Sequence, residues 1–136
     1  KSVDVLVTSV DEAVRFAEET GVDALAVAIG TAHGNYREKP NLRIDRLKEI
    51  HAATKTRLVL HGGTGLTEQD FRTCLANGID KINIATASYD ASAAKIKAVH
   101  SEKPEANYFD FSNAIVEATY ANVKKHMQIF GLNGKA

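Results

Sequence analysis

Two histidines stand where an apolar run gives way to glycine-rich sequence. His33 lies in AIGTAHG, residues 28–34, and His61 lies in LVLHGG, residues 58–63. Neutral imidazole nitrogen is a common zinc ligand, and a catalytic zinc usually has three protein ligands. Each histidine could instead be an ordinary strand-end residue that is hydrogen-bonded to the backbone. The residues alone therefore leave a partial zinc site and a structural role both open.

The glycines that follow His61 suggest a second kind of chemistry. Residues 62–65, with the sequence GGTG, precede a predicted helix N-cap at Thr67. Backbone N–H groups and one hydroxyl could converge there on an anion near a helix N-terminus. Asn83 and Thr86 end the next apolar run and could add polar ligands. A tight turn with a helix cap explains Gly65 and Thr67. It accounts less well for three glycines that occur together with Asn83 and Thr86, so the pattern predicts a phosphate site.

The elements that must position these residues alternate along the chain. Helical spacing, caps and glycine stops predict helices at 9–21, 42–54, 66–78, about 88–99 and about 111–130. Short apolar runs predict buried strands at 23–29, 56–61 and 80–86. The segments 30–41 and 100–107 read as a long loop and a polar break. This order predicts an α/β fold with right-handed parallel crossovers.

In a parallel sheet, both histidines would lie at the carboxyl edge, where α/β folds bind ligands. Three parallel strands leave two unprotected edges, so the sheet looks incomplete as an independent domain. We therefore expect the chain to be a piece of a larger barrel.

Composition limits the remaining possibilities. The 136 residues, 44% of them hydrophobic, are enough for one domain with a sizeable core. Lys and Arg total 17 and so do Asp and Glu, which argues against nucleic-acid or membrane partners. No signal peptide or membrane-spanning run is seen, so the expected location is cytoplasmic. The single cysteine, Cys74, excludes an intrachain disulfide and is expected to be a small packed hydrophobe.

Three motifs in this order, AVAIGTAHG, LVLHGGTG and KINIAT, resemble those of the class II, metal-dependent ketose-bisphosphate aldolases. This family includes the fructose- and tagatose-bisphosphate aldolases. The resemblance implies a (β/α)8 TIM barrel, of which residues 1–136 would form the C-terminal half, with about strands six to eight and their helices. The N-terminal half of the barrel would be absent from this chain and would be its partner.

The resemblance also assigns roles to residues. His33 and His61 would be two of three zinc ligands, and a monovalent cation, Na⁺ or K⁺, would lie near the substrate phosphate. Some fructose-specific members have Asp where this chain has Ala85, so the sequence looks closer to the tagatose type. The residues implied to hold the dihydroxyacetone phosphate half of the substrate are Gly34, Gly62, Gly63, Thr64, Asn83, Ile84, Ala85 and Thr86.

The implied activity is reversible cleavage of a ketose 1,6-bisphosphate into dihydroxyacetone phosphate and an aldehyde phosphate, with zinc stabilising the enediolate. In the family, the third zinc histidine, a proton-transferring aspartate and a lid glutamate lie in the first half of the barrel. This fragment alone would then be inactive. The class II mechanism also removes any need for Lys81 as a Schiff-base lysine.

Two alternatives remain open. A metal-independent phosphate-binding barrel enzyme, such as an isomerase or decarboxylase, would explain the glycines without zinc. A non-catalytic sugar-phosphate binding protein would keep only the anion site. Metal analysis of the full-length protein separates the first alternative from an aldolase.

Other residues have weaker assignments. Arg37 could reach phosphate as a fork donor or be a solvated loop charge, whereas His51, His100 and His126 are expected to be ordinary helix residues. The last helix has more apolar positions than one packed stripe needs, which predicts a homodimer or larger homo-oligomer. These positions are Ile115, Val116, Ala118, Thr119, Val123, Met127 and Phe130.

Overall fold

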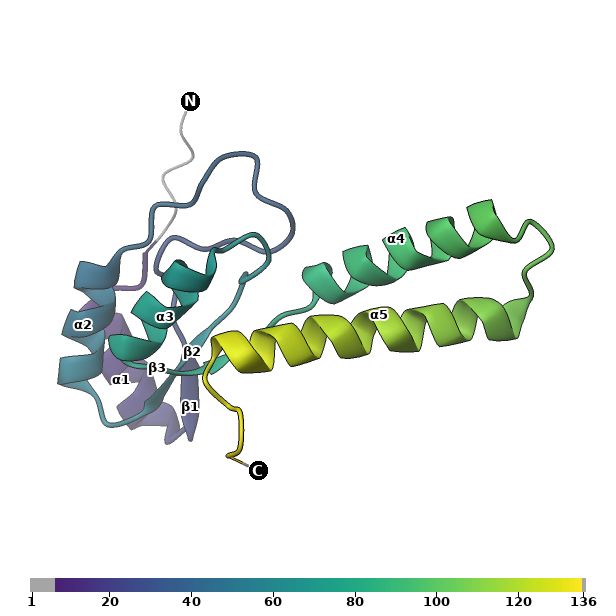
Figure 1. Cartoon of the computed structure of the whole chain (residues 1–136). Coiled ribbons are helices and arrows are strands. Elements are labelled where there is room, and N and C mark those ends of the chain that lie inside the picture. Colours follow the sequence, from purple (N-terminus) through teal and green to yellow (C-terminus); the bar gives the residue numbers. More distant parts are fainter. Residues whose placement is uncertain (1–6, 136) are drawn as a thin grey trace. The chain divides into compact units, whose positions relative to one another are not determined.

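The computed structural model describes residues 7–135 and contains eight helices and strands within that range (Figure 1). The chain divides into two compact units, Lys1–Ile84 and Ala85–Ala136, and each is described by itself. The elements are α1 (Val10–Thr20), β1 (Ala24–Ala26), α2 (Ile44–Ala53), β2 (Arg57–Leu60), α3 (Glu68–Ala76), β3 (Ile79–Ile82), α4 (Thr86–Glu102) and α5 (Tyr108–Ile129).

The first unit contains a parallel sheet with the strand order β1-β2-β3. Leu25 pairs with Leu58, and Leu58 pairs with Ile79, but the register between β2 and β3 shifts after Leu58, so that Val59 pairs with Lys81. Strand order follows chain order without reversal, so right-handed crossovers place α2 and α3 on the same face. The packing of α2 against both α1 and α3 agrees with this arrangement. The predicted α/β class is confirmed.

Burial differs between the two faces of the sheet at β1 and the residues after it, although Val59 of β2, which pairs with the exposed Ala26, is also buried. Val27 and Ile29 are buried, whereas the alternating residues Ala24, Ala26 and Ala28 are exposed. Because strand side chains alternate between faces, the alanines lie on the face opposite the helices. The packed side holds a continuous apolar core. Its fully buried large side chains are Phe71, Ile29, Leu47, Ile50, Leu58, Leu60 and Cys74.

The predicted N-caps of α1 and α3 and the glycine stop of α1 are confirmed, whereas α3 ends at Ala76 with Asn77 as its C-cap, before the predicted stop at Gly78. Ser9 caps α1 in a capping box with Glu12, and Gly21 ends this helix in the left-handed conformation at φ 64°. Thr67 caps α3 in the same way, with Asp70 as its capping-box partner. These local hydrogen bonds satisfy backbone groups that each helix end leaves free, so the sequence alone sets these helix starts.

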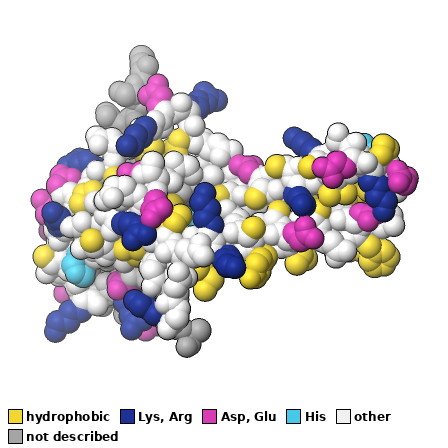
Figure 2. Space-filling model, in the orientation of Figure 1, with side chains coloured by type: hydrophobic (Ala, Val, Ile, Leu, Met, Phe, Trp, Pro, Cys, Tyr) yellow, Lys and Arg dark blue, Asp and Glu magenta, His cyan; other side chains and the backbone are white. Residues whose placement is uncertain are grey.

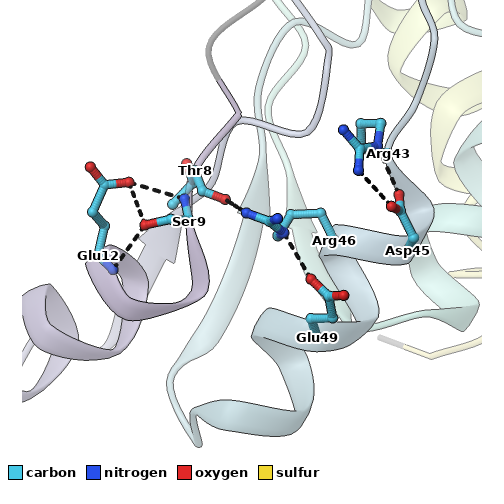
Figure 3. A network of polar contacts seen from close by, with 7 residues as sticks. All are labelled: Thr8, Ser9, Glu12, Arg43, Asp45, Arg46 and Glu49. Atoms are coloured by element: carbon cyan, nitrogen blue, oxygen red, sulfur yellow. Dashed lines mark hydrogen bonds and ion pairs between the residues drawn. The ribbon is translucent and has the colours of Figure 1, made fainter.

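Polar contacts tie the residues before α1 to α2 (Figure 3). The Arg46 guanidinium donates to the carbonyl oxygen of Thr8 at 3.2 Å and to the Glu49 carboxylate at 2.8 Å. Arg46 thus bridges two segments that are 38 residues apart in the sequence. The network fixes α2 beside the start of α1, on the outer side of the sheet.

All three predicted strands are shorter in the structure, and the predicted strand 56–61 is β2, Arg57–Leu60. The predicted strand 23–29 is β1, Ala24–Ala26, because the backbone turns to other partners beyond it. The Ala28 N–H donates to the Thr8 hydroxyl at 2.9 Å, and the Ile29 carbonyl accepts from the Arg43 N–H at 2.8 Å. The predicted strand 80–86 is β3, Ile79–Ile82, and its last predicted residue, Thr86, begins α4 instead.

The second unit is a hairpin of α4 and α5. Both helices extend further toward their connection than predicted. The helix α4 continues to Glu102 and not only to about residue 99, and α5 begins at Tyr108 and not at about residue 111. The Asn107 side chain caps α5 by accepting from the N–H groups of Phe109 and Asp110, which explains the earlier start. In residues 7–135, neither of these helices nor any other is long and apolar enough to cross a membrane.

Candidate functional site

The structure brings His33 and His61 together. His61 directly follows β2, and His33 lies in the connection between β1 and α2. Nε2 of His33 is 3.3 Å from Nδ1 of His61, and the two rings are nearly perpendicular, at 89°. Both residues line a cavity of about 300 Å³ together with residues 26–28 at the end of β1 and with Gly62. The parallel strand ends therefore place two imidazole nitrogens at one edge of the sheet.

This spacing suits a shared metal ion. Two zinc–nitrogen bonds of about 2.0–2.1 Å meeting at the tetrahedral angle put their nitrogens about 3.3–3.4 Å apart. Within residues 7–135, no group of three or more His, Cys, Asp or Glu side chains is arranged to hold a metal. The two histidines thus fit zinc as a pair, and a complete site needs a further ligand from outside the described residues.

Asn83 links His61 to β3. Its Nδ2 lies 3.0 Å from Nε2 of His61, and its Oδ1 accepts from the Lys81 ammonium at 2.5 Å. Because an ammonium can only donate, this contact orients the Asn83 amide with its NH₂ toward His61. Nε2 of His61 then accepts, and the neutral ring carries its proton on Nδ1. Asn83, which the sequence predicts to contact phosphate, therefore lies in direct contact with His61, a predicted metal ligand.

The loops after β1 and β2 touch at Ala32 and Gly62. Gly62 has a φ of 70°, and a Cβ there would overlap the carbonyl oxygen of Ala32. The Tyr36 hydroxyl donates to the Gly62 carbonyl at 2.6 Å and accepts from the Ala32 N–H at 3.1 Å. Sequence reasoning missed Tyr36. The available signal was an aromatic residue three positions after His33 in a loop that is otherwise polar.

The glycine loop after β2, residues 62–65, packs directly against hydrophobic side chains. A Cβ at Gly63 would lie 3.0 Å from both Ile84 Cδ1 and Phe71 Cε1, so this glycine lets the loop lie on the core. Thr64 is buried, with 8% of its surface exposed. Gly65 has a φ of 90°, where glycine is favoured. The predicted phosphate loop therefore has a fixed backbone that depends on glycine for two different reasons.

The remaining predicted residues are less closely grouped. Gly34 has a φ of 88° with open space where a Cβ would be. Arg37 is exposed and lines a second hollow of about 310 Å³ beside Gly65 and Thr67. Ala85 and Thr86 begin the second unit, as the N-cap and first residue of α4. Their predicted contribution to phosphate binding remains a prediction.

The other histidines occupy structural positions. The His51 ring packs against Gly78 so closely that a Cβ on this glycine would overlap its Cγ. The His100 ring contacts Phe111 across the hairpin, and Nδ1 of His126 lies 2.8 Å from the Asn122 carbonyl oxygen. Cys74 is fully buried, as predicted, and burial raises the pKa of its thiol to about 11, which keeps it protonated at neutral pH.

Comparison with known proteins places these features in context. The family model for fructose-bisphosphate aldolase class-II matches residues 1–135. The chain is 35% identical over 129 residues to YdjI of Escherichia coli strain K12, which covers 95% of this chain and 45% of that protein. It is 37% identical over 134 residues to sulfofructosephosphate aldolase of Alkalicoccus urumqiensis, and this alignment covers 98% of this chain and 47% of that protein.

Solved structures show the same similarity. The crystal structure of the E. coli YdjI aldolase superposes with a TM-score of 0.85, covering 96% of this chain and 48% of that one. A putative fructose-1,6-bisphosphate aldolase from Coccidioides immitis also gives 0.85, at 28% identity, covering 96% and 45%. The chain thus spans about half the length of the proteins that it matches.

Proposed function

Because the chain belongs to the class-II fructose-bisphosphate aldolase family, we propose that it forms the C-terminal half of a zinc-dependent ketose-bisphosphate aldolase. The full-length enzyme would reversibly cleave a ketose 1,6-bisphosphate into dihydroxyacetone phosphate and an aldehyde phosphate. Residues 1–136 would supply about strands six to eight of a single (β/α)8 domain. The unreversed strand order and the exposed side chains of Ala24 and Ala26, on the β1 face opposite the helices, support this placement, since a barrel interior lies opposite its helices.

The observation that carries the proposal is the pair of imidazole nitrogens 3.3 Å apart at the carboxyl edge of the sheet. His33 would bind zinc through Nε2 and His61 through Nδ1. With a metal on Nδ1, the ring proton of His61 would lie on Nε2, and the Asn83 amide would have to turn its Oδ1 toward this nitrogen and give up its contact with Lys81. A bound zinc supplies Lewis-acid stabilisation of the negative charge that develops beside the substrate ketone.

The N-terminal half of the barrel completes this site in our proposal. It would provide the third zinc ligand, the aspartate that exchanges a proton with the aldehyde oxygen, and a lid glutamate. The described residues supply binding and orientation, so we expect residues 1–136 alone to be inactive.

The loop after β2 would hold the phosphate of the dihydroxyacetone phosphate half. Its backbone lies directly after a metal ligand and before the N-terminus of α3, where N–H groups and the helix dipole favour an anion. We also propose that a monovalent cation, Na⁺ or K⁺, binds near this phosphate. The proposed contacts are Gly34, Gly62, Gly63, Thr64, Asn83, Ile84, Ala85 and Thr86, with Arg37 as a further candidate.

The substrate is narrowed by these residues to sugar phosphates that share the dihydroxyacetone phosphate half. Ala85 stands where some fructose-specific members have aspartate, which favours a tagatose-type substrate. The relative named sulfofructosephosphate aldolase adds sulfofructose phosphate as a third candidate.

The test is a cleavage assay on the full-length protein with fructose 1,6-bisphosphate, tagatose 1,6-bisphosphate and sulfofructose phosphate as substrates. We expect cleavage of at least one of them, loss of activity after dialysis against a chelator, and recovery on addition of zinc. Activity that resists complete removal of the metal would contradict the proposal.

We also propose that the full-length enzyme is a cytoplasmic homo-oligomer and that α5 provides an interface. Hydrophobic side chains are visible on the α4–α5 hairpin in Figure 2. Large exposed hydrophobic side chains form a stripe on α5 at three- and four-residue spacing. Side chains at this spacing share one face of a helix and can pack against another helix. Its members are Val116, Tyr120, Val123 and Met127, which are 64%, 66%, 46% and 45% exposed.

Charge placed in this stripe should separate the subunits. We expect Val116→Glu combined with Val123→Glu to reduce the mass measured by light scattering at micromolar concentration, because two desolvated carboxylates oppose association. Lys125→Glu, at an exposed position of α5 outside the stripe, is the control. A wild-type protein that is already monomeric at this concentration would refute the interface.

A further inference from the structure

We propose that Tyr36 is a positioning residue that sets the distance between His33 and His61. This inference rests on the proposed zinc site. Its basis is a single hydroxyl that joins the two loops, each of which carries one histidine.

The hydroxyl contacts the immediate neighbours of both histidines. Ala32, whose N–H donates to the Tyr36 oxygen at 3.1 Å, precedes His33. Gly62, whose carbonyl accepts from the Tyr36 O–H at 2.6 Å, follows His61. The phenol therefore fixes both loops one residue from the imidazoles. A phenol can do this because its oxygen donates one hydrogen bond and accepts another.

The ring itself is held in place. A Cβ at Gly65 would lie 3.0 Å from Cδ2 of Tyr36, so the ring packs closely against the glycine loop before α3. Burial raises the pKa of the Tyr36 phenol, although the hydrogen bond from Ala32 opposes this effect. The group thus stays protonated at neutral pH and keeps its proton for the Gly62 carbonyl.

The two histidines depend differently on this link. His61 is anchored by its position after β2 and by Asn83. His33 is exposed and lies in the long connection between β1 and α2, outside any helix or strand. A loop residue of this kind needs tertiary contacts to hold its position, and zinc tolerates little error in ligand distance. Loss of the Tyr36 hydroxyl should therefore allow the loop with His33 to move away from His61.

The experiment compares wild-type, Tyr36→Phe and His33→Ala forms of the full-length protein, because Tyr36→Phe removes one oxygen atom and keeps the ring. Zn²⁺ affinity is measured by competition with a chelator, and the geometry of the site is read from the visible absorption of Co²⁺-substituted protein. We expect Tyr36→Phe to weaken Zn²⁺ binding about 3- to 30-fold and to shift the Co²⁺ spectrum. Groups that contact a ligand directly typically cost about 10- to 100-fold.

Ser9→Ala is the matched control for stability. It removes the capping box of α1, far from the two loops in sequence, and should lower the unfolding temperature while leaving Zn²⁺ affinity and the Co²⁺ spectrum unchanged. If Tyr36→Phe behaves like Ser9→Ala while His33→Ala loses zinc, the positioning role is wrong and the zinc site stands. If the wild type itself binds no zinc, or His33→Ala binds as well as the wild type, both proposals are overturned.

Discussion

Replacing His33 or His61 by alanine in the full-length protein is expected to lower Zn²⁺ affinity by more than about 100-fold and to remove aldol cleavage. Changes to groups that only support a ligand already cost about 10- to 100-fold, so loss of a ligand itself should exceed this range. The 3.3 Å approach of the two nitrogens means that each alanine leaves its partner as the single remaining donor among the described residues. Chelator competition and the cleavage assay measure the two effects.

Both variants should remain folded, because neither imidazole belongs to the fully buried core: His33 is exposed and His61 is half-buried. His100→Ala provides a control in which a histidine of α4 is removed without change to the first unit. We expect wild-type zinc content and activity for this control. Full activity in either site variant would show that the paired histidines are not the metal ligands.

Replacing Gly62 by alanine is expected to lower the free energy of unfolding by about 2–5 kcal/mol. The left-handed backbone conformation costs a non-glycine residue about 1–2 kcal/mol, and forcing atoms into a packed region costs about 1–3 kcal/mol more. Here the new Cβ would overlap the carbonyl oxygen of Ala32, and a backbone atom cannot move aside as a flexible side chain can. Denaturant unfolding of the metal-free protein measures this change.

Gly21→Ala separates the two costs. Gly21 has a similar φ, 64° against 70° for Gly62, but no atom lies within 4 Å of its Cβ position. We expect this variant to lose only the conformational cost of about 1–2 kcal/mol. Equal losses in the two variants would show that the loops after β1 and β2 do not meet at Ala32 and Gly62 as the structure places them.

The Zn²⁺ affinity of Gly62→Ala is a second measurement of the contact between Ala32 and Gly62. The overlap pushes Ala32 away from Gly62, and these residues neighbour His33 and His61. The folded fraction of Gly62→Ala should therefore bind Zn²⁺ more weakly than the wild type, whereas Gly21→Ala should bind it normally. A destabilised Gly62→Ala protein with unchanged zinc affinity would mean that the contact supports the fold but not the site.

Local signals in the sequence determined most of the elements. Ser9 and Thr67 each accept a hydrogen bond from the backbone of their own first helical turn, so the helix starts could be predicted without knowledge of the rest of the chain. Strand ends were less predictable. β1 ends where Ala28 and Ile29 pair with Thr8 and Arg43, which are distant in sequence and carry no local signal for this pairing.

The same division holds for the candidate site. Sequence determined that histidines follow two consecutive apolar runs, and parallel pairing then requires both to lie at one edge of the sheet, since parallel strands share a direction. Tertiary structure alone decided that Nε2 of His33 lies 3.3 Å from Nδ1 of His61. It also placed the Tyr36 hydroxyl between Ala32 and Gly62. These distances depend on strand register and on loop dihedral angles between residues that are 26 to 28 positions apart, and no local pattern of residue types encodes them.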